Sequence, residues 1–257
     1  MPESVISSDQ LARLCAVALD LLERTILVSD HKTVLYANPA TARLLRANSA
    51  SELIGLPAEQ LSHPDSRSAA HLRRTIAEEL GQGLSELPTK IVARDGTIYS
   101  GITDMCPISF QEQVAFVYTG RIPSDRKSPN GHSRAAADRA NRKSMFETIA
   151  EVVPDIIMIH NEELVLFANA ACRRFLAAQS PADIEGRPVD IVVHADSFAA
   201  GRERRRLLLE GGSPIKGIPV KIVSLDNQTK HVTVNAYPLA VDGHVPAAAI
   251  IAPASAV

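Results

Sequence analysis

The sequence predicts an α+β fold of two similar domains, each a five-stranded antiparallel sheet with helices on one face and an amphipathic helix before it. Three observations lead to this prediction. The chain has 257 residues, enough for two domains of ordinary size. One half of the sequence repeats in the other half at a constant offset. Within each copy, strand-like runs and segments of helical spacing follow one another in the same order.

The composition is that of a folded protein, with 46% hydrophobic and 22% charged residues. A net charge of −2 gives no basic excess of the kind that indicates nucleic-acid binding. Cys15, Cys106 and Cys172 lie far apart and form no CxxC pair, which favours a reducing compartment. The N-terminus lacks the features of a secretory signal, and no apolar run reaches the roughly 20 residues of a spanning helix. We therefore expect a cytoplasmic protein with no membrane span.

The internal repeat is found by aligning Asn38 with Asn169, an offset of 131 residues that needs no gap. VLYANPATARLL (34–45) then falls on VLFANAACRRFL (165–176). Glycines, prolines and paired arginines further along keep the same offset. Because apolar, turn and glycine positions coincide together, the repeat indicates a duplicated domain.

In the first copy, the runs 25–30 and 32–38 predict two short strands joined by a turn. Helical spacing follows, and Asp65 is expected to cap a longer helix over 66–80. An apolar stripe at four-residue spacing runs along that helix: Leu72, Ile76 and Leu80. Three longer strands follow, the first two joined by a hairpin turn at 95–96. The second copy repeats this order, which predicts one antiparallel sheet in each.

Both copies are preceded by an apolar stripe at helical spacing. The first stripe is Leu11, Leu14, Ala18, Leu21 and Leu22, and the second is Met145, Phe146, Ile149, Val152 and Val153. We expect these faces to pack in a homodimer, the alternative being packing within one chain. The basic segment 121–143 predicts a solvated connector that becomes helical from about Arg134, the alternative being a membrane or nucleic-acid contact. The predicted parts are an N-terminal helix (1–24), a first domain (25–121), a linker with a connecting helix (122–153) and a second domain (154–257).

The motif order resembles the PAS (Per-Arnt-Sim) family. The motifs are the VLYANPA run after the second strand, ELIG at 52–55, HPD at 63–65 and DGT at 95–97. The resemblance covers 25–121 and 154–252. It implies that each copy is a PAS domain with a pocket between its helical segment and one face of its sheet. It also implies a sensory or signalling role, without fixing a ligand.

For the pocket of the first copy, the inward strand positions include several aromatic residues. The predicted lining is Tyr99, Ile102, Phe116 and Tyr118, together with Ile91. The corresponding positions of the second copy are smaller and aliphatic: Ile222, Val232, Val234, Ala248 and Ile250. Small side chains leave room for a ligand but also suit a tight core, so both interpretations stay open. If only one copy binds a ligand, we expect it to be the first.

Haem and flavin are the cofactors that the resemblance suggests. Haem-binding PAS domains carry their iron-ligating histidine on the long helix, which makes His71 a candidate haem ligand. The second copy has Arg202 there, so only the first could bind haem in this way. Flavin is less favoured, because the chain has no tryptophan and Cys172 lies on a different helix from the photoactive cysteine of light-oxygen-voltage domains. The identity of any cofactor is left open.

No catalytic motif is found, whether GxSxG, a glycine-rich phosphate loop or HExxH, so we expect no enzymatic activity. Two functional hypotheses follow. The first is a sensor that binds a small ligand and relays the change through its flanking helices. The second is a ligand-free module for protein–protein interaction or dimerisation. In either case the partner could be a signalling protein or an output domain, and the chain could be the sensory part of a larger kinase or cyclase.

Overall fold

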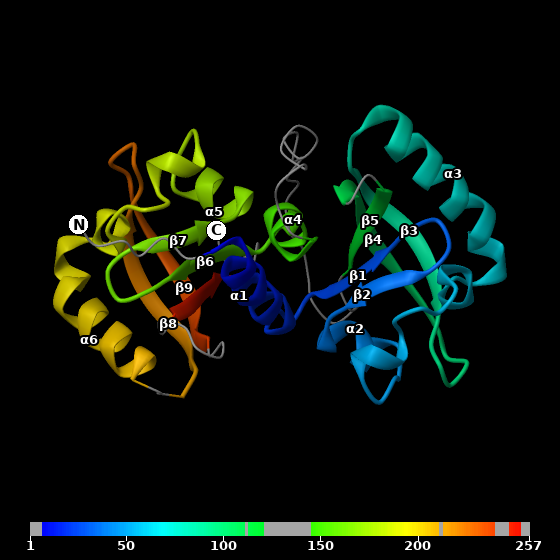
Figure 1. Cartoon of the computed structure of the whole chain (residues 1–257), viewed down its shortest axis with the longest axis horizontal. Helices are drawn as coiled ribbons and strands as arrows, with labels where there is room; N and C mark the ends of the chain where they lie inside the picture. The colour runs from blue at the N-terminus through cyan, green and yellow to red at the C-terminus, as the bar shows by residue number, and fades with distance from the viewer. Residues whose placement is uncertain (1–6, 111–112, 121–144, 211–212, 240–246, 253–257) are drawn as a thin grey trace. The chain divides into compact units, whose positions relative to one another are not determined.

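The computed structural model describes residues 7–110, 113–120, 145–210, 213–239 and 247–252 (Figure 1). Contacts divide the chain into two compact units. One unit is Leu19–Ile149, and the other is Ala150–Val257 together with the N-terminal residues as far as Ala18. The boundaries therefore fall inside two helices that precede the sheets, α1 (Ser8–Asp20) and α4 (Met145–Val152). The predicted connector 121–143 lies outside the described residues.

The first sheet has the strand order β2-β1-β5-β4-β3, and every neighbouring pair is antiparallel. Its strands are β1 (Thr25–Ser29), β2 (Val34–Ala37), β3 (Leu84–Val92), β4 (Ile98–Phe110) and β5 (Gln113–Gly120). Between β2 and β3 the chain forms α2 (Pro39–Leu44), two short 3₁₀ turns (Ala50–Glu52 and Ala58–Leu61) and α3 (Pro64–Leu80). Helix α3 packs on β3 and β4 (Figure 1).

The second sheet repeats this topology in the order β7-β6-β10-β9-β8. Its strands are β6 (Ile156–His160), β7 (Val165–Ala168), β8 (Ile215–Val223), β9 (Thr229–Leu239) and β10 (Ala247–Ala252). Its helices are α5 (Ala170–Phe175) and α6 (Phe198–Leu209), with 3₁₀ turns at Pro181–Asp183, Val189–Val192 and Ala195–Ser197. The predicted α+β class and the two five-stranded sheets are confirmed. Among the described residues, no helix has the length and apolarity needed to cross a membrane.

The duplication extends to unusual backbone angles. Gly96 and Asn227, which are 131 residues apart, have φ of 82° and 62° in the hairpin turns of the two copies. Glycine and asparagine are the residues that adopt this left-handed region most readily, which explains their use there. The two hairpins therefore share a backbone conformation as well as a position in the sequence.

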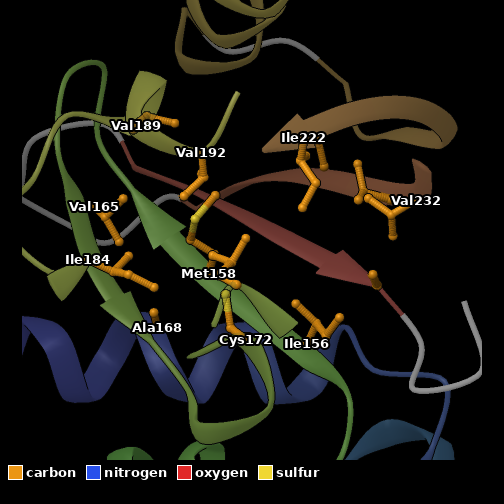
Figure 2. Packing of buried hydrophobic residues seen from close by; sticks show 14 of the residues in the cluster. Ile156, Met158, Val165, Ala168, Cys172, Ile184, Val189, Val192, Ile222 and Val232 are labelled. Carbon is orange, nitrogen blue, oxygen red and sulfur yellow. The ribbon is translucent and has the colours of Figure 1, made fainter. Parts of the chain in front are cut away.

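The buried core of the second domain lies between its sheet and helices, where side chains from several strands converge (Figure 2). Those drawn in the figure include Ile156, Met158, Val165, Ala168, Cys172, Ile184, Ile222 and Val232. All of them are less than a tenth exposed. Strand β6 is buried along its whole length, as expected for a run of β-branched and apolar residues flanked by strands on both sides.

The start and the inner face of α3 differ from prediction. The N-cap is His63, whose Nδ1 accepts a hydrogen bond from the Asp65 backbone N–H at 3.3 Å, so Asp65 lies in the first turn. The predicted apolar stripe is not the buried face, because Leu72 and Leu80 are 58% and 60% exposed. Arg74 and Ala77 are the buried residues of the helix. A charged residue thus occupies the face that apolar periodicity would assign to leucine.

Candidate functional site

A cavity of about 140 Å³ lies inside the first domain, between the sheet and the helical segment. Strands β1, β3, β4 and β5 form one wall, and α2 and α3 form the other. Most of the wall is apolar and includes Leu27, Leu45, Leu61, Leu87, Ile91 and Met105. Pockets for drug-sized ligands usually measure about 300–1,000 Å³, so this one suits a smaller molecule.

Three polar groups border the cavity without a hydrogen-bond partner: the Arg74 Nε, the Tyr118 hydroxyl and the Ser29 hydroxyl. They are three of the four buried, unpartnered side-chain N or O atoms among the described residues. Arg74 is only 5% exposed and Ser29 is fully buried. Native proteins leave few buried polar atoms unpaired, so such a concentration in one cavity calls for an explanation.

The three groups lie close enough to influence one another. Burial raises the pKa of Tyr118, while Arg74 and then Ser29 oppose that rise. Arg74 and Ser29 both approach the Tyr118 hydroxyl, but the Arg74 Nε, the Tyr118 Oη and the Ser29 Oγ form no hydrogen bond of normal length and angle. The cavity therefore holds a cation and two hydroxyl groups that could all point donors at one acceptor.

The second domain has a cavity of about 120 Å³ at the corresponding place, and the fourth unpartnered atom, the Arg205 Nε, belongs to its lining. Arg205, at the position of Arg74, donates from Nη2 to Asp190 Oδ1 at 2.6 Å. Partial burial would raise the pKa of Asp190, but hydrogen bonds from Arg202 and Arg205 outweigh burial and lower it. His160 replaces Ser29, and its Nδ1 lies 2.6 Å from the Asn161 carbonyl oxygen. This domain therefore supplies an anion to its own partly buried arginine.

Only some of the residues predicted to line the pocket of the first domain have side chains that face the cavity. Tyr99 and Tyr118 line the cavity. Ile102 also borders it, but its side chain is 59% exposed and points to the other face of β4, as strand alternation requires. Phe116 is fully buried outside the cavity lining, with its ring edge-on to His31 at 5.1 Å. His71, the candidate haem ligand, is exposed on α3 and is not part of the cavity lining.

The thiols of Cys106 and Cys172 are disfavoured as nucleophiles by their burial. Burial raises the pKa of the Cys106 thiol to about 11 and that of Cys172 to about 12, which disfavours the thiolate in both. Within the described residues, none of the three cysteines forms a disulfide. In the part of the chain that the structure describes, no three His, Cys, Asp or Glu residues come together as a metal site.

Sequence reasoning missed two asparagines that join each preceding helix to its sheet. The amide nitrogen of Asn38 donates to the carbonyls of Leu19, Leu22 and Arg24, and its Oδ1 accepts from the backbone N–H of Ile26. Asn169 does the same for the carbonyls of Ala150, Val153 and Asp155 and the N–H of Ile157. The sequence feature that could have identified them is the presence of asparagine at both positions of the 131-residue repeat. Arg74 and Arg205 also matched in the repeat, but burial could not be inferred from that match.

Two family models match the chain, one described as "PAS domain" over residues 23–120 and one as "PAS fold" over residues 150–253. Similar solved structures include a PAS domain from Colwellia psychrerythraea (21% identity, 43% of this chain and 95% of that one, TM-score 0.39). Another is the PAS domain of nitrogen regulation protein NR(II) from Vibrio parahaemolyticus (23% identity, 42% and 94%, TM-score 0.35). A third is the Rhodobacter sphaeroides LOV protein (16% identity, 45% and 68%, TM-score 0.37). No curated protein sequence matches the chain.

The two family matches fall on the two copies of the repeat, and each copy has the five-stranded antiparallel sheet with helices that the motif order implied. The chain belongs to the PAS family and carries two PAS domains in tandem.

Proposed function

We propose that this protein is a sensor whose first PAS domain binds a small ligand in its cavity and relays binding through the helix that precedes its sheet. The presence of two PAS domains supports a sensory or signalling role. The observation that carries the ligand proposal is the cavity of about 140 Å³ bordered by three unpartnered polar groups. A domain that served only as a packed interaction module would gain stability by filling that space or pairing those groups.

The route for the relay is the bonded junction between the preceding helix and the sheet. Besides the three carbonyls held by Asn38, the Tyr36 hydroxyl donates to Asp20 Oδ1 at 2.8 Å. Burial raises the pKa of Asp20, and the bond from Tyr36 opposes that rise. These bonds tie the end of α1 to β2, so a change in the sheet would reach the helix. A ligand shifts such an equilibrium only if it binds the two arrangements unequally.

The proposal assigns the chain no catalytic step, and it places the protein in the cytoplasm, in keeping with three cysteines that lie far apart and form no CxxC pair. Dimerisation through the flanking helices stays a prediction. An output partner is also proposed, because neither PAS domain is assigned an output activity.

The proposal is tested by filling the cavity. Ala70 lines it from α3, so Ala70→Leu should remove space for a ligand and abolish ligand-dependent stabilisation. Ser68 lies on the same helix, is exposed and is not part of the lining, so Ser68→Leu should leave that stabilisation unchanged. The measurement is the melting temperature of the whole chain with a metabolite library, together with native mass spectrometry of freshly purified protein. No bound species and no compound that shifts the melting temperature would overturn the proposal.

A further inference from the structure

We infer that the ligand of the first PAS domain is a small monocarboxylate, with its carboxylate on Arg74 and its apolar body in the rest of the cavity. This inference rests on the proposed function and adds to it the chemical class of the ligand and the residues that select it. Tyr118 and Ser29 are assigned as the additional hydrogen-bond donors to the carboxylate.

The first argument is the state of Arg74. The residue is only 5% exposed, its Nε has no hydrogen-bond partner, and within the described residues it makes no ion pair; the polar group beside it is the neutral hydroxyl of Tyr118. A buried cation with no anion beside it is strongly unfavourable. A bound anion would satisfy it, and the planar guanidinium matches a carboxylate in two parallel hydrogen bonds.

The second argument is the other copy of the domain. There the equivalent arginine, Arg205, is paired with Asp190. The residue at the position of Asp190 in the first copy is Glu59, which is exposed and forms no ion pair with Arg74. One copy thus pairs the equivalent, partly buried arginine with a carboxylate of its own chain. The first copy has the arginine but lacks that carboxylate. We therefore expect the carboxylate of a bound ligand to occupy the corresponding position.

The two hydroxyl groups of the site are also confined to the first copy. Tyr118 lies opposite Leu27 in the sheet, and Ile250 lies opposite Met158, so Ile250 takes the place of Tyr118. Ser29 is replaced by His160, which is engaged with the Asn161 carbonyl. The second domain therefore lacks both hydroxyls, and we assign it no ligand.

The charge of the cavity lining and the volume of the cavity restrict the class of ligand further. Arg73 also borders the cavity, but it donates to the Pro88 carbonyl at 2.9 Å and is partly exposed, which leaves Arg74 as the single buried cation of the lining. One buried cation and apolar walls favour one negative charge, because a second charge on a phosphate would be buried unpaired. A cavity of about 140 Å³ is comparable to one that accommodates a benzene-sized body. The ligand is therefore a short-chain or aromatic monocarboxylate.

The test is a titration of the whole chain with monocarboxylates from propionate to octanoate and with benzoate, followed by calorimetry and by the melting temperature. The corresponding amides and inorganic phosphate are the chemical controls. We expect at least one acid to bind, its amide to bind roughly tenfold or more weakly, and phosphate not to bind. Arg74→Met should weaken binding of that acid roughly tenfold or more, and Tyr118→Phe should weaken it several-fold.

Arg67→Met is the matched control, because Arg67 lies on the same helix, is exposed and is outside the lining. It should bind the acid as the unmodified chain does. Without ligand, Arg74→Met should melt no lower than the unmodified chain, because it removes a buried cation that has no carboxylate partner among the described residues. This readout shows that any loss of binding is not a loss of folding.

The outcomes separate this inference from the proposed function. Equal binding of acid and amide, unchanged binding by Arg74→Met, or Arg74-dependent binding of phosphate would overturn the monocarboxylate assignment. If a neutral compound binds instead and Ala70→Leu abolishes its binding, the proposed sensory function stands and this inference fails. If nothing binds and nothing co-purifies, both fail.

Discussion

Replacement of Asn169 by alanine is expected to lower the free energy of unfolding of the second PAS domain by about 3–4 kcal/mol. Its side chain is fully buried and is shared among five backbone groups. The Oδ1 accepts from the N–H groups of Ile157 and Cys172, and the amide donates to three carbonyls. Alanine would leave these groups buried without partners and would also remove the N-cap of α5.

Asn38→Ala should have a similar effect on the first domain, where the side chain is also fully buried. Asn38→Asp is a sharper variant, because aspartate keeps the acceptor but turns a carboxylate oxygen toward the carbonyls of Leu19, Leu22 and Arg24. It should destabilise at least as much as alanine does. Urea denaturation followed by circular dichroism measures the change, and hydrogen exchange of peptides from each domain shows where it occurs.

Asn48→Ala is the matched control for the first domain. Asn48 is exposed and bonds only to the side chain of Glu52, so the expected change is within about 0.5 kcal/mol. If Asn38→Ala proves as mild as this control, the helix–sheet junction does not depend on its hydrogen bonds. The relay route proposed for the first domain would then lose its basis.

The second large effect is a dependence of the stability of the second PAS domain on pH. Burial lowers the pKa of His160 to about 4; the hydrogen bond to the Asn161 carbonyl opposes the decrease, and the charge of Arg205 adds to it. In the unfolded chain this imidazole takes up a proton near pH 6.5, whereas in the folded domain it does so only near pH 4. Between these values the unfolded state binds more protons, so the second domain loses stability as pH falls from about 7 to about 4. The loss amounts to about 3 kcal/mol.

His160→Ser tests this dependence, because serine is the residue at the equivalent position of the first domain. The variant should reduce the slope of stability against pH in that interval, measured by urea denaturation at a series of pH values. His231→Gln changes an exposed histidine of the same domain and should keep the slope of the unmodified chain. Equal slopes for His160→Ser and the unmodified chain would show that His160 titrates alike in the folded and unfolded states.

The fold was predictable because the sequence contains it twice. The alternation of the strands, the turn at Gly96 and the capping positions all recur at a fixed offset. Each of these patterns depends on a few neighbouring residues and directly favours one backbone conformation, so it can be read from the sequence. The inner face of α3 was not predictable in this way. Leu72 and Leu80 have the helical spacing of a buried stripe, yet Arg74 is the buried residue. Hydropathy assigns arginine to the surface, and only the tertiary structure shows a cavity that admits it.

The candidate site was therefore only partly predictable. Strand periodicity led to Tyr118 and Tyr99, because alternate residues of a strand share a face. It placed Phe116 beside Tyr118 on that face, but it could not show that the cavity ends before Phe116. Ser29 gave no signal by itself, and the difference between Glu59 and Asp190 acquires meaning only when Arg74 is seen to be buried without an ion pair and Arg205 to be paired with Asp190.

The two buried asparagines also determine where the chain can pivot. Asn169 holds the carbonyls of residues 150, 153 and 155, so this stretch cannot swing away from β6 and α5 unless buried hydrogen bonds break. Asn38 holds residues 19, 22 and 24 in the same way. Any low-energy hinge between a sheet and its preceding helix therefore lies on the N-terminal side of Leu19 or of Ala150. A torque applied to either helix would therefore rotate the end of that helix and the edge of its sheet together, as one rigid body.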